Sequence, residues 1–269
     1  MSGASLRARF EEIRAEKRAA LVVYLTHGDP SPEASVDLLA ALADAGADVI
    51  ELGVPFSDPS ADGVVIQEAM QRALKAGSGL LPALASVREF RDKGYTTPIV
   101  LFGYFNPIYV YGLEAFAKAA ADAGVDAVLT VDLPIDELSE LHEPLGEHGV
   151  GVVPLLAPTS TPERIARVAD FQPSFVYYVS MTGVTGAAFQ GASGGPERIA
   201  MIREKSGAPV AVGFGIKTAD DAKKVAAYAD GVVVGSALVR RIAEAASAPE
   251  ACTSLAELTR SLRSAMPTG

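Results

Sequence analysis

Short apolar runs recur along the chain, each followed by a loop and a stretch of helical periodicity. Nearly continuous apolar character is typical of parallel strands that are buried on both faces. Eight strands alternating with helices predict a closed (β/α)8 barrel, and a doubly wound open sheet is the alternative because periodicity alone does not establish closure. The runs are Leu21–Leu25, Asp48–Leu52, Ile99–Phe102, Ala127–Val131, Gly151–Leu155, Phe175–Val179, Val210–Val212 and Gly231–Val234.

Helix signals occupy the segments between these runs. Thr161-Pro-Glu and Thr218-Ala-Asp-Asp each place a capping residue before an amphipathic stretch. The gap after the second run has room for an extra helix around Ile66–Lys75, and the tail after Pro249 predicts a further helix after the eighth run. We therefore expect one barrel domain over residues 1–269, with extra helices after strands 2 and 8.

Composition limits the class of protein. The net charge is −10 and the basic residues are scattered, which argues against a nucleic-acid surface. The single Cys252 excludes an internal disulfide, and no spacing of Cys and His suits zinc, so we expect no metal. Residues 1–19 are charged throughout, with Leu6, Phe10 and Ile13 at the spacing of an amphipathic helix. Because no apolar run approaches the ~20 residues that span a bilayer, we expect a cytoplasmic protein without a membrane partner.

Two carboxylates near the end of the second run are candidate catalytic groups. Glu51 lies between Ile50 and Leu52, where the mouth of an apolar barrel would partly desolvate it and raise its pKa. Asp62 follows on a loop flanked by Gly63, where we expect it to stay ionised. The alternative for Glu51 is a strand-end carboxylate paired with a Lys or Arg. Asp58 is interpreted as a turn or interface residue.

Glycines after the late runs predict a phosphate site. Gly213-Phe-Gly215 follows the seventh run, and Gly235-Ser236 follows the eighth and opens a short helix, which is the arrangement in which backbone N–H groups meet an anion. Gly183-Val-Thr-Gly186 after the sixth run would close the third side. Any one glycine pair alone is better interpreted as a tight turn, but three such loops on consecutive strands favour phosphate. They match neither the dinucleotide fingerprint nor the P-loop, so a nicotinamide or nucleotide triphosphate cofactor is disfavoured.

Aromatic residues lie near several predicted strand ends. Tyr24, Tyr104 and Tyr177 either fill the top of the barrel or form a slot for a flat aromatic substrate. His27 follows the first run, but no nucleophile–base pattern includes it.

These motifs together resemble the tryptophan synthase α subunit. The resemblance rests on Glu51-Leu-Gly-Val-Pro-Phe-Ser-Asp-Pro with Ala61-Asp-Gly63, then on Gly183–Gly186, Gly213–Ile216 and Gly235-Ser236. It extends from about the first strand to the last helix. It implies a (β/α)8 barrel that cleaves indole-3-glycerol phosphate to indole and glyceraldehyde 3-phosphate without a cofactor in this chain.

The resemblance also implies roles for individual residues. Glu51 would be the general acid–base at indole C3 and the glycerol hydroxyl, Asp62 would accept the indole N–H, and Tyr177 would lie near the reacting carbons. The phosphate would be held by Gly186, Gly215, Gly235 and Ser236. The substrate pocket would include Tyr24, Phe102, Tyr104, Thr185 and Phe214.

A partner is implied as well. The family works with a pyridoxal-phosphate (PLP) β subunit that receives indole, as an α2β2 complex, and Pro55, Phe56 and Asp58 would face it. The loop from Met181 to about Gly195 would close over substrate. Four positions depart from the usual pattern of the family: Ser60, Val64, Met181 and His27. These departures concern coupling to the partner and the rate of loop closure rather than the chemistry.

Other functions remain open at this point. One is an indole-releasing lyase of the same fold that needs no β subunit. A second is a non-catalytic barrel that binds a phosphate ligand and activates a partner, although such a barrel would not require Glu51 and Asp62. A third is a different phosphosugar lyase or isomerase, which would dispense with the aromatic slot.

Overall fold

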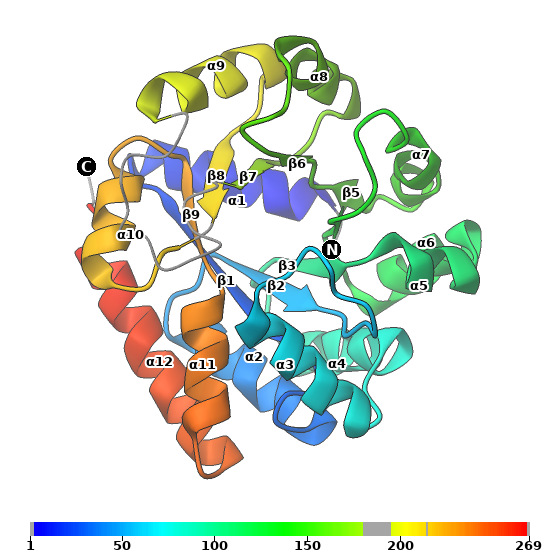
Figure 1. The fold of residues 1–269 in the computed structure, drawn as a ribbon, viewed down its shortest axis with the longest axis vertical. Helices are drawn as coiled ribbons and strands as arrows, with labels where there is room; N and C mark the ends of the chain where they lie inside the picture. The colour runs from blue at the N-terminus through cyan, green and yellow to red at the C-terminus, as the bar shows by residue number, and fades with distance from the viewer. Residues whose placement is uncertain (1–2, 180–194, 214, 268–269) are drawn as a thin grey trace.

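The strands of the computed structural model form one parallel sheet that curls into a ring (Figure 1). The structure describes residues 3–179, 195–213 and 215–267. The strands pair in the order β5-β4-β3-β2-β1-β9-β8-β7-β6. Their bounds are β1 (Ala20–Thr26), β2 (Val49–Gly53), β3 (Ile99–Gly103), β4 (Ala127–Thr130), β5 (Gly151–Val152), β6 (Leu155–Leu156), β7 (Val176–Val179), β8 (Val210–Gly213) and β9 (Gly231–Val234).

The ring closes through the fifth predicted strand, which is divided into β5 and β6. Pro154 interrupts it because proline has no N–H to donate. The N–H of Val153 still donates to Val128 O (2.9 Å), and the Pro154 carbonyl accepts from the N–H of Tyr177 (3.0 Å). The first half of the segment therefore joins β4 and the second half joins β7. This continuity, together with the pairing of β1 with β9, confirms the barrel and excludes the open sheet.

Helices surround the ring in the order expected of a barrel (Figure 1). The extra helix after the second strand is present as α3 before α4, and the tail forms α12 after α11. A further short helix after β3, α5, is not predicted by the periodicity because seven residues make too few turns to show one. The helices are α1 (Gly3–Ala15), α2 (Ser35–Asp44), α3 (Val64–Lys75), α4 (Leu80–Asp92), α5 (Phe105–Tyr111), α6 (Leu113–Ala123), α7 (Ser139–Glu147), α8 (Pro162–Arg167), α9 (Pro196–Ser206), α10 (Ala219–Ala226), α11 (Ser236–Glu244) and α12 (Ala248–Ala265), with 3-10 turns at Pro32–Ala34 and Val168–Phe171.

Two of the predicted helix starts are capped as expected. The Thr161 side chain accepts the N–H of Arg164 (3.4 Å) at the start of α8. Thr218 and Asp221 form a reciprocal capping box at the start of α10. No helix in the described part of the chain is both long enough and apolar enough to span a membrane.

Side chains alternate along each strand between the barrel interior and the helix layer. The interior cluster contains Val22 and Tyr24 from β1, whereas Leu21, Val23 and Leu25 pack in the outer cluster. Helix α1 lies across the N-terminal end of the ring rather than in the outer layer (Figure 1). Its predicted apolar face enters the interior cluster, and Phe10 stacks on Phe175 at 5.0 Å between ring centroids. The amphipathic N-terminal helix therefore closes the floor of the barrel.

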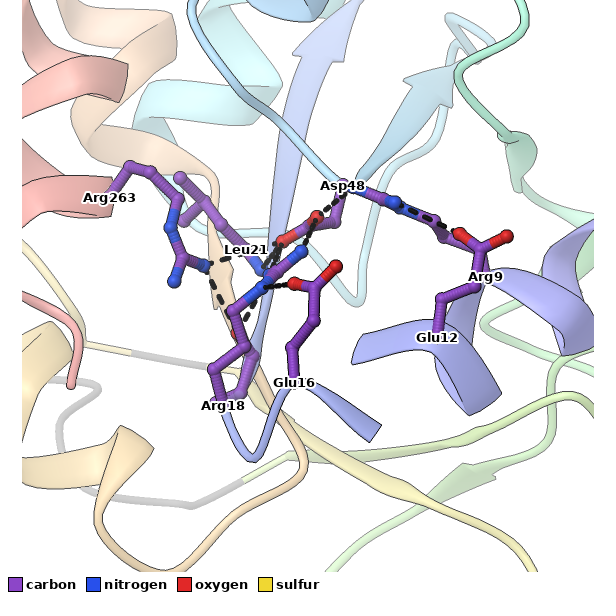
Figure 2. Close-up of polar contacts among 8 residues, drawn as sticks. Arg9, Glu12, Glu16, Arg18, Leu21, Asp48 and Arg263 are labelled. Carbon is purple, nitrogen blue, oxygen red and sulfur yellow. Dashed lines mark hydrogen bonds and ion pairs between the residues drawn. The ribbon is translucent and has the colours of Figure 1, made fainter. Parts of the chain in front are cut away.

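A buried carboxylate fastens the floor to both ends of the chain (Figure 2). Asp48, immediately before β2, is 2% exposed. It accepts two hydrogen bonds from Arg18 (2.7 and 2.8 Å), one from Arg9 (2.6 Å) and one from the backbone N–H of Leu21 (2.9 Å). Arg263 of α12 approaches it at 3.5 Å. The cluster joins α1, the first two strands and the last helix.

The same arrangement recurs before two other strands. Asp126, immediately before β4, accepts the N–H of Ile99 and a guanidinium N–H of Arg91, both at 2.8 Å. Asp230, immediately before β9, accepts the N–H of Val210 and an arginine of α9, again both at 2.8 Å. Each aspartate joins the start of one strand to the start of the preceding strand. The neighbouring strands are thereby held in register at the floor, opposite the C-terminal strand ends where (β/α)8 barrels carry their active sites.

Candidate active site

Glu51 lies on the interior face of β2. Its neighbours Ile50 and Leu52 pack in the outer cluster and Val49 in the interior one, so the alternation turns Glu51 inward, in register with Tyr24. The side chain is 1% exposed, and its Oε1 has no hydrogen-bond partner among the described residues. Burial raises its pKa to about 8. With this pKa the carboxyl can release and regain a proton near neutrality, and no ion pair to Glu51 is found in the described part of the chain.

Asp62 approaches the same end of the barrel from the loop before α3. The Tyr104 hydroxyl donates a hydrogen bond to Asp62 Oδ2 at 2.7 Å and accepts the N–H of Ala61 at 3.0 Å. Burial raises the pKa of Asp62, and the Tyr104 hydrogen bond acts in the opposite direction. Asp62 is therefore less open to water than the sequence predicts, because Tyr104 draws its loop against the end of β3. Tyr104 has a polar role as well as a packing role.

Three aromatic rings line the interior beside Glu51. Tyr24 meets Phe102 edge-on at 5.2 Å between centroids, and Phe102 lies 6.4 Å from Tyr177. Burial, followed by the charges of Glu51 and Asp62, raises the pKa of Tyr177 far above its ordinary value, so its hydroxyl stays protonated.

Glycines make room for two of these tyrosines. A Cβ at Gly53 would lie 2.2 Å from the Tyr24 hydroxyl oxygen, and a Cβ at Gly213 would lie 2.1 Å from that of Tyr177. Any larger residue at either strand end would displace the ring. The strands thus fix both hydroxyls close to the carboxylates.

The predicted phosphate residues lie at the rim of β8 and β9. Gly213 of β8 is paired with Val233 of β9. Gly215 and Gly235 each follow two residues after these paired positions. Gly215 has φ +78°, a conformation that favours glycine. Gly235 precedes α11, and Ser236 is its first residue. The N–H of Leu238 already donates to Gly235 O (2.9 Å), so the N–H groups of Ser236 and Ala237 are the ones that could meet an anion.

Some predicted residues lie outside the described part of the chain. They are Thr185, Gly186 and Phe214, together with nearly all of the Met181–Gly195 loop.

The predicted partner-facing residues lie in different settings within this chain. Pro55 is buried, and Phe56 is half-buried with its ring stacked on Tyr104 at 5.0 Å between centroids. Asp58 is exposed in a turn, where it accepts a hydrogen bond from Ser57 (2.5 Å). Phe56 therefore connects the loop to the tyrosine that holds Asp62, a link that the sequence does not reveal.

His27 lies in the helix layer instead of the barrel interior. It is fully buried, with Nδ1 2.6 Å from Ser78 Oγ and Nε2 2.9 Å from Ser86 Oγ. Because the Ser78 hydroxyl donates to the His27 carbonyl (3.0 Å), Nδ1 must carry the proton and Nε2 must accept from Ser86. Burial lowers the pKa of His27 to about 4. Its role is to join the end of β1 to the α3–α4 segment.

The site can therefore perform acid–base chemistry. A buried carboxyl with a pKa of about 8 lies among aromatic rings, a second carboxyl group approaches from a loop, and the predicted phosphate residues Gly215, Gly235 and Ser236 lie at the rim of β8 and β9. Among the described residues, no group of three or more His, Cys, Asp or Glu could hold a metal ion.

Comparisons with known proteins agree with this architecture. The family model described as tryptophan synthase alpha chain matches residues 10–266. Proteins of that name from Thioalkalivibrio sulfidiphilus and Nitrosococcus oceani are 52% and 48% identical, over 96% of this chain and 97% and 96% of theirs. The crystal structure of the tryptophan synthase subunit alpha from Legionella pneumophila is 38% identical, with a TM-score of 0.88 over 98% of both chains. A chain of Mycobacterium tuberculosis tryptophan synthase gives the same identity, TM-score and coverage. The chain belongs to the tryptophan synthase alpha chain family.

Proposed function

We propose that this chain cleaves indole-3-glycerol phosphate to indole and glyceraldehyde 3-phosphate, with Glu51 and Asp62 as its catalytic pair. The observation that carries the proposal is Glu51 itself, an interior carboxyl with a pKa of about 8 and an oxygen that has no partner among the described residues. Such a group can donate a proton and recover one within a single turnover. The identity of the substrate is inferred from membership of the tryptophan synthase alpha chain family.

The reaction begins with protonation of the ring. Glu51 in its protonated form donates to indole C3, which becomes tetrahedral while positive charge spreads to the ring nitrogen. Asp62 accepts the hydrogen bond from the ring N–H and stabilises this charge. Tyr104 holds the Asp62 carboxylate by its 2.7 Å hydrogen bond.

Bond cleavage then restores the enzyme. The Glu51 carboxylate takes the proton of the hydroxyl on the glycerol carbon attached to indole C3. This carbon becomes a carbonyl, its bond to C3 breaks, and the electrons of that bond return to the ring. The products are indole and glyceraldehyde 3-phosphate, and Glu51 is protonated again. These steps need no cofactor in this chain.

The remaining residues bind and orient the substrate. Tyr24, Phe102 and Tyr177 offer apolar ring faces beside Glu51 for a flat indole. Gly215 after β8 and Gly235 and Ser236 at the start of α11 would bind the phosphate through backbone N–H groups. Thr185, Gly186 and Phe214 belong to the same proposal through the family resemblance alone.

The proposal includes a partner. A tryptophan synthase β subunit carrying PLP would receive the indole, in an α2β2 complex within the cytoplasm, and the loop with Pro55, Phe56 and Asp58 would contact it. Phe56 stacks on Tyr104, and Tyr104 donates a hydrogen bond to Asp62. A β-subunit contact at this loop would therefore be connected to Asp62 through these two residues.

The test is indole release by the purified chain, alone and with a tryptophan synthase β subunit. We expect indole from indole-3-glycerol phosphate, a faster rate with the β subunit, and no cleavage of a phosphosugar that lacks the indole ring. An equal rate with and without the β subunit would favour the independent lyase. Cleavage of the ring-free sugar alone would contradict the proposed substrate.

A further inference from the structure

We infer that Gln67 is a positioning residue for Asp62: its side-chain amide holds the turn from which the Asp62 carboxylate projects. The inference rests on the proposed role of Asp62. It extends that proposal to a residue on α3 whose side chain contacts the backbone of the turn and not the Asp62 carboxylate.

The turn spans residues 59–62. The N–H of Asp62 donates to Pro59 O at 3.1 Å, which closes the turn. The Gln67 Nε2 group donates to Asp62 O at 2.8 Å and to Pro59 O at 3.3 Å. Both partners are carbonyl oxygens, so the amide must present its nitrogen to them. One side chain therefore joins the first and last residues of the turn.

Tyr104 holds the same turn from the other side. Its hydroxyl binds the Ala61 N–H and the Asp62 carboxylate. Tyr104 fixes the direction of the carboxylate, and Gln67 fixes the backbone that bears it. Without Gln67, the turn would be held, among the described residues, only by its own Asp62 N–H to Pro59 O hydrogen bond and by the two hydrogen bonds of Tyr104.

Gln67 is itself fixed, because α3 is anchored to the barrel. Arg72 of the same helix makes two hydrogen bonds to Asp29, at 2.8 and 2.9 Å, just beyond the end of β1. Asp29 is 1% exposed and the Arg72 side chain is 39% exposed, so the carboxylate is buried while the guanidinium remains partly in contact with water. A continuous set of contacts thus runs from β1 through α3 and Gln67 to Asp62.

The test replaces the amide by an apolar side chain of similar length. Gln67→Met removes both hydrogen bonds, and Gln71→Met makes the same change one turn later on α3, where the side chain is exposed. Indole release is measured in single turnovers with enzyme in excess, so that slow variants remain measurable. We expect Gln67→Met to lower the rate about 10- to 100-fold, as a displaced catalytic group does, and Gln71→Met to leave it within about twofold.

Making Gln67→Met in an Asp62→Asn enzyme as well as in wild type distinguishes a positioning role of Gln67 from general structural damage. If Gln67 acts through Asp62, Gln67→Met changes the rate of an Asp62→Asn enzyme less than about twofold, because the group it positions is already lost. Gln67→Glu is the second variant, since an ionised carboxylate cannot donate to the two carbonyls, and we expect a loss at least as large. Urea midpoints check that all variants are folded.

Two results would overturn the inference. One is a Gln67→Met rate equal to that of Gln71→Met, and the other is the same loss in the wild-type and Asp62→Asn backgrounds. Failure of the proposed function looks different, because the wild-type chain itself would then release no indole from indole-3-glycerol phosphate.

Discussion

Replacing Glu51 by Gln should change the stability of the fold by an amount that becomes more favourable as pH rises. The carboxyl is buried and holds its proton up to a pKa of about 8, whereas in the unfolded chain its pKa returns to about 4.5. Between these values the unfolded chain loses a proton that the folded chain retains. The free energy of unfolding of the wild type therefore falls as pH rises through this window.

The magnitude follows from the two pKa values. Each pH unit between them removes about 1.4 kcal/mol of wild-type stability. Between pH 5 and pH 8 this amounts to about 3 kcal/mol, allowing for partial ionisation at each end. Gln carries no proton to lose in either state, so Glu51→Gln escapes the penalty. Its stability relative to wild type should thus be about 3 kcal/mol more favourable at pH 8 than at pH 5.

Urea unfolding of both proteins at the two pH values measures this difference directly. Any effect of the amide on stability that does not depend on pH is the same at both pH values and cancels in this difference. Glu257→Gln is the matched control, because Glu257 is exposed on α12 and its effect should change by less than about 0.5 kcal/mol. If the stability of Glu51→Gln relative to wild type is the same at pH 5 and pH 8, Glu51 is not a buried protonated acid.

Three further substitutions test other parts of the structure. Tyr104→Phe removes the hydrogen bond that lowers the pKa of Asp62, so kcat/KM for indole release should fall about tenfold and the acid limb of its pH profile should move to higher pH. Gly213→Ala places a Cβ 2.1 Å from the Tyr177 hydroxyl and should displace that ring, which steady-state indole release would register as a loss of activity. Asp126→Ala removes the ion-pair partner of the part-buried Arg91 and the acceptor of the buried Ile99 N–H, and urea unfolding should show a loss of about 3 kcal/mol.

Matched controls exist for each of these changes. Tyr111→Phe alters a tyrosine that is exposed on α5 and should leave the pH profile unchanged. Gly146→Ala adds a Cβ with no heavy atom within 4 Å and should retain activity. Asp122→Ala removes an exposed ion pair and should cost less than about 1 kcal/mol. Equal effects from a variant and its control would refute the structural reason given for that variant.

The barrel and its inward carboxylate were predictable because they depend on local pattern. Buried parallel strands are apolar on both faces, and the eight predicted runs all contribute strands. The two-residue alternation places Glu51 on the face opposite Ile50 and Leu52, and the closed ring shows that this face is the interior. The break at Pro154 was also visible in principle, since proline cannot donate to a strand ladder.

Other features depend on contacts between distant segments and left no local signal. The hydrogen bond from Tyr104 to Asp62 joins residues 42 positions apart and exists only because β2 and β3 are neighbours. No local pattern marks the aspartates that hold strand starts: Asp48 is the first residue of the predicted second run, and Asp126 and Asp230 stand just before later runs. The partners of His27 come from two positions beyond α3, so its buried role appears only once that segment is packed against β1.

The most direct test of the account is indole release from indole-3-glycerol phosphate by wild type, Glu51→Gln and Asp62→Asn under identical conditions. Loss of a general acid–base typically costs 10²–10⁴-fold, so we predict a fall of that size for Glu51→Gln and a substantial fall for Asp62→Asn, with both proteins folded. Equal rates for wild type and Glu51→Gln would contradict the proposal that the buried carboxyl moves the proton.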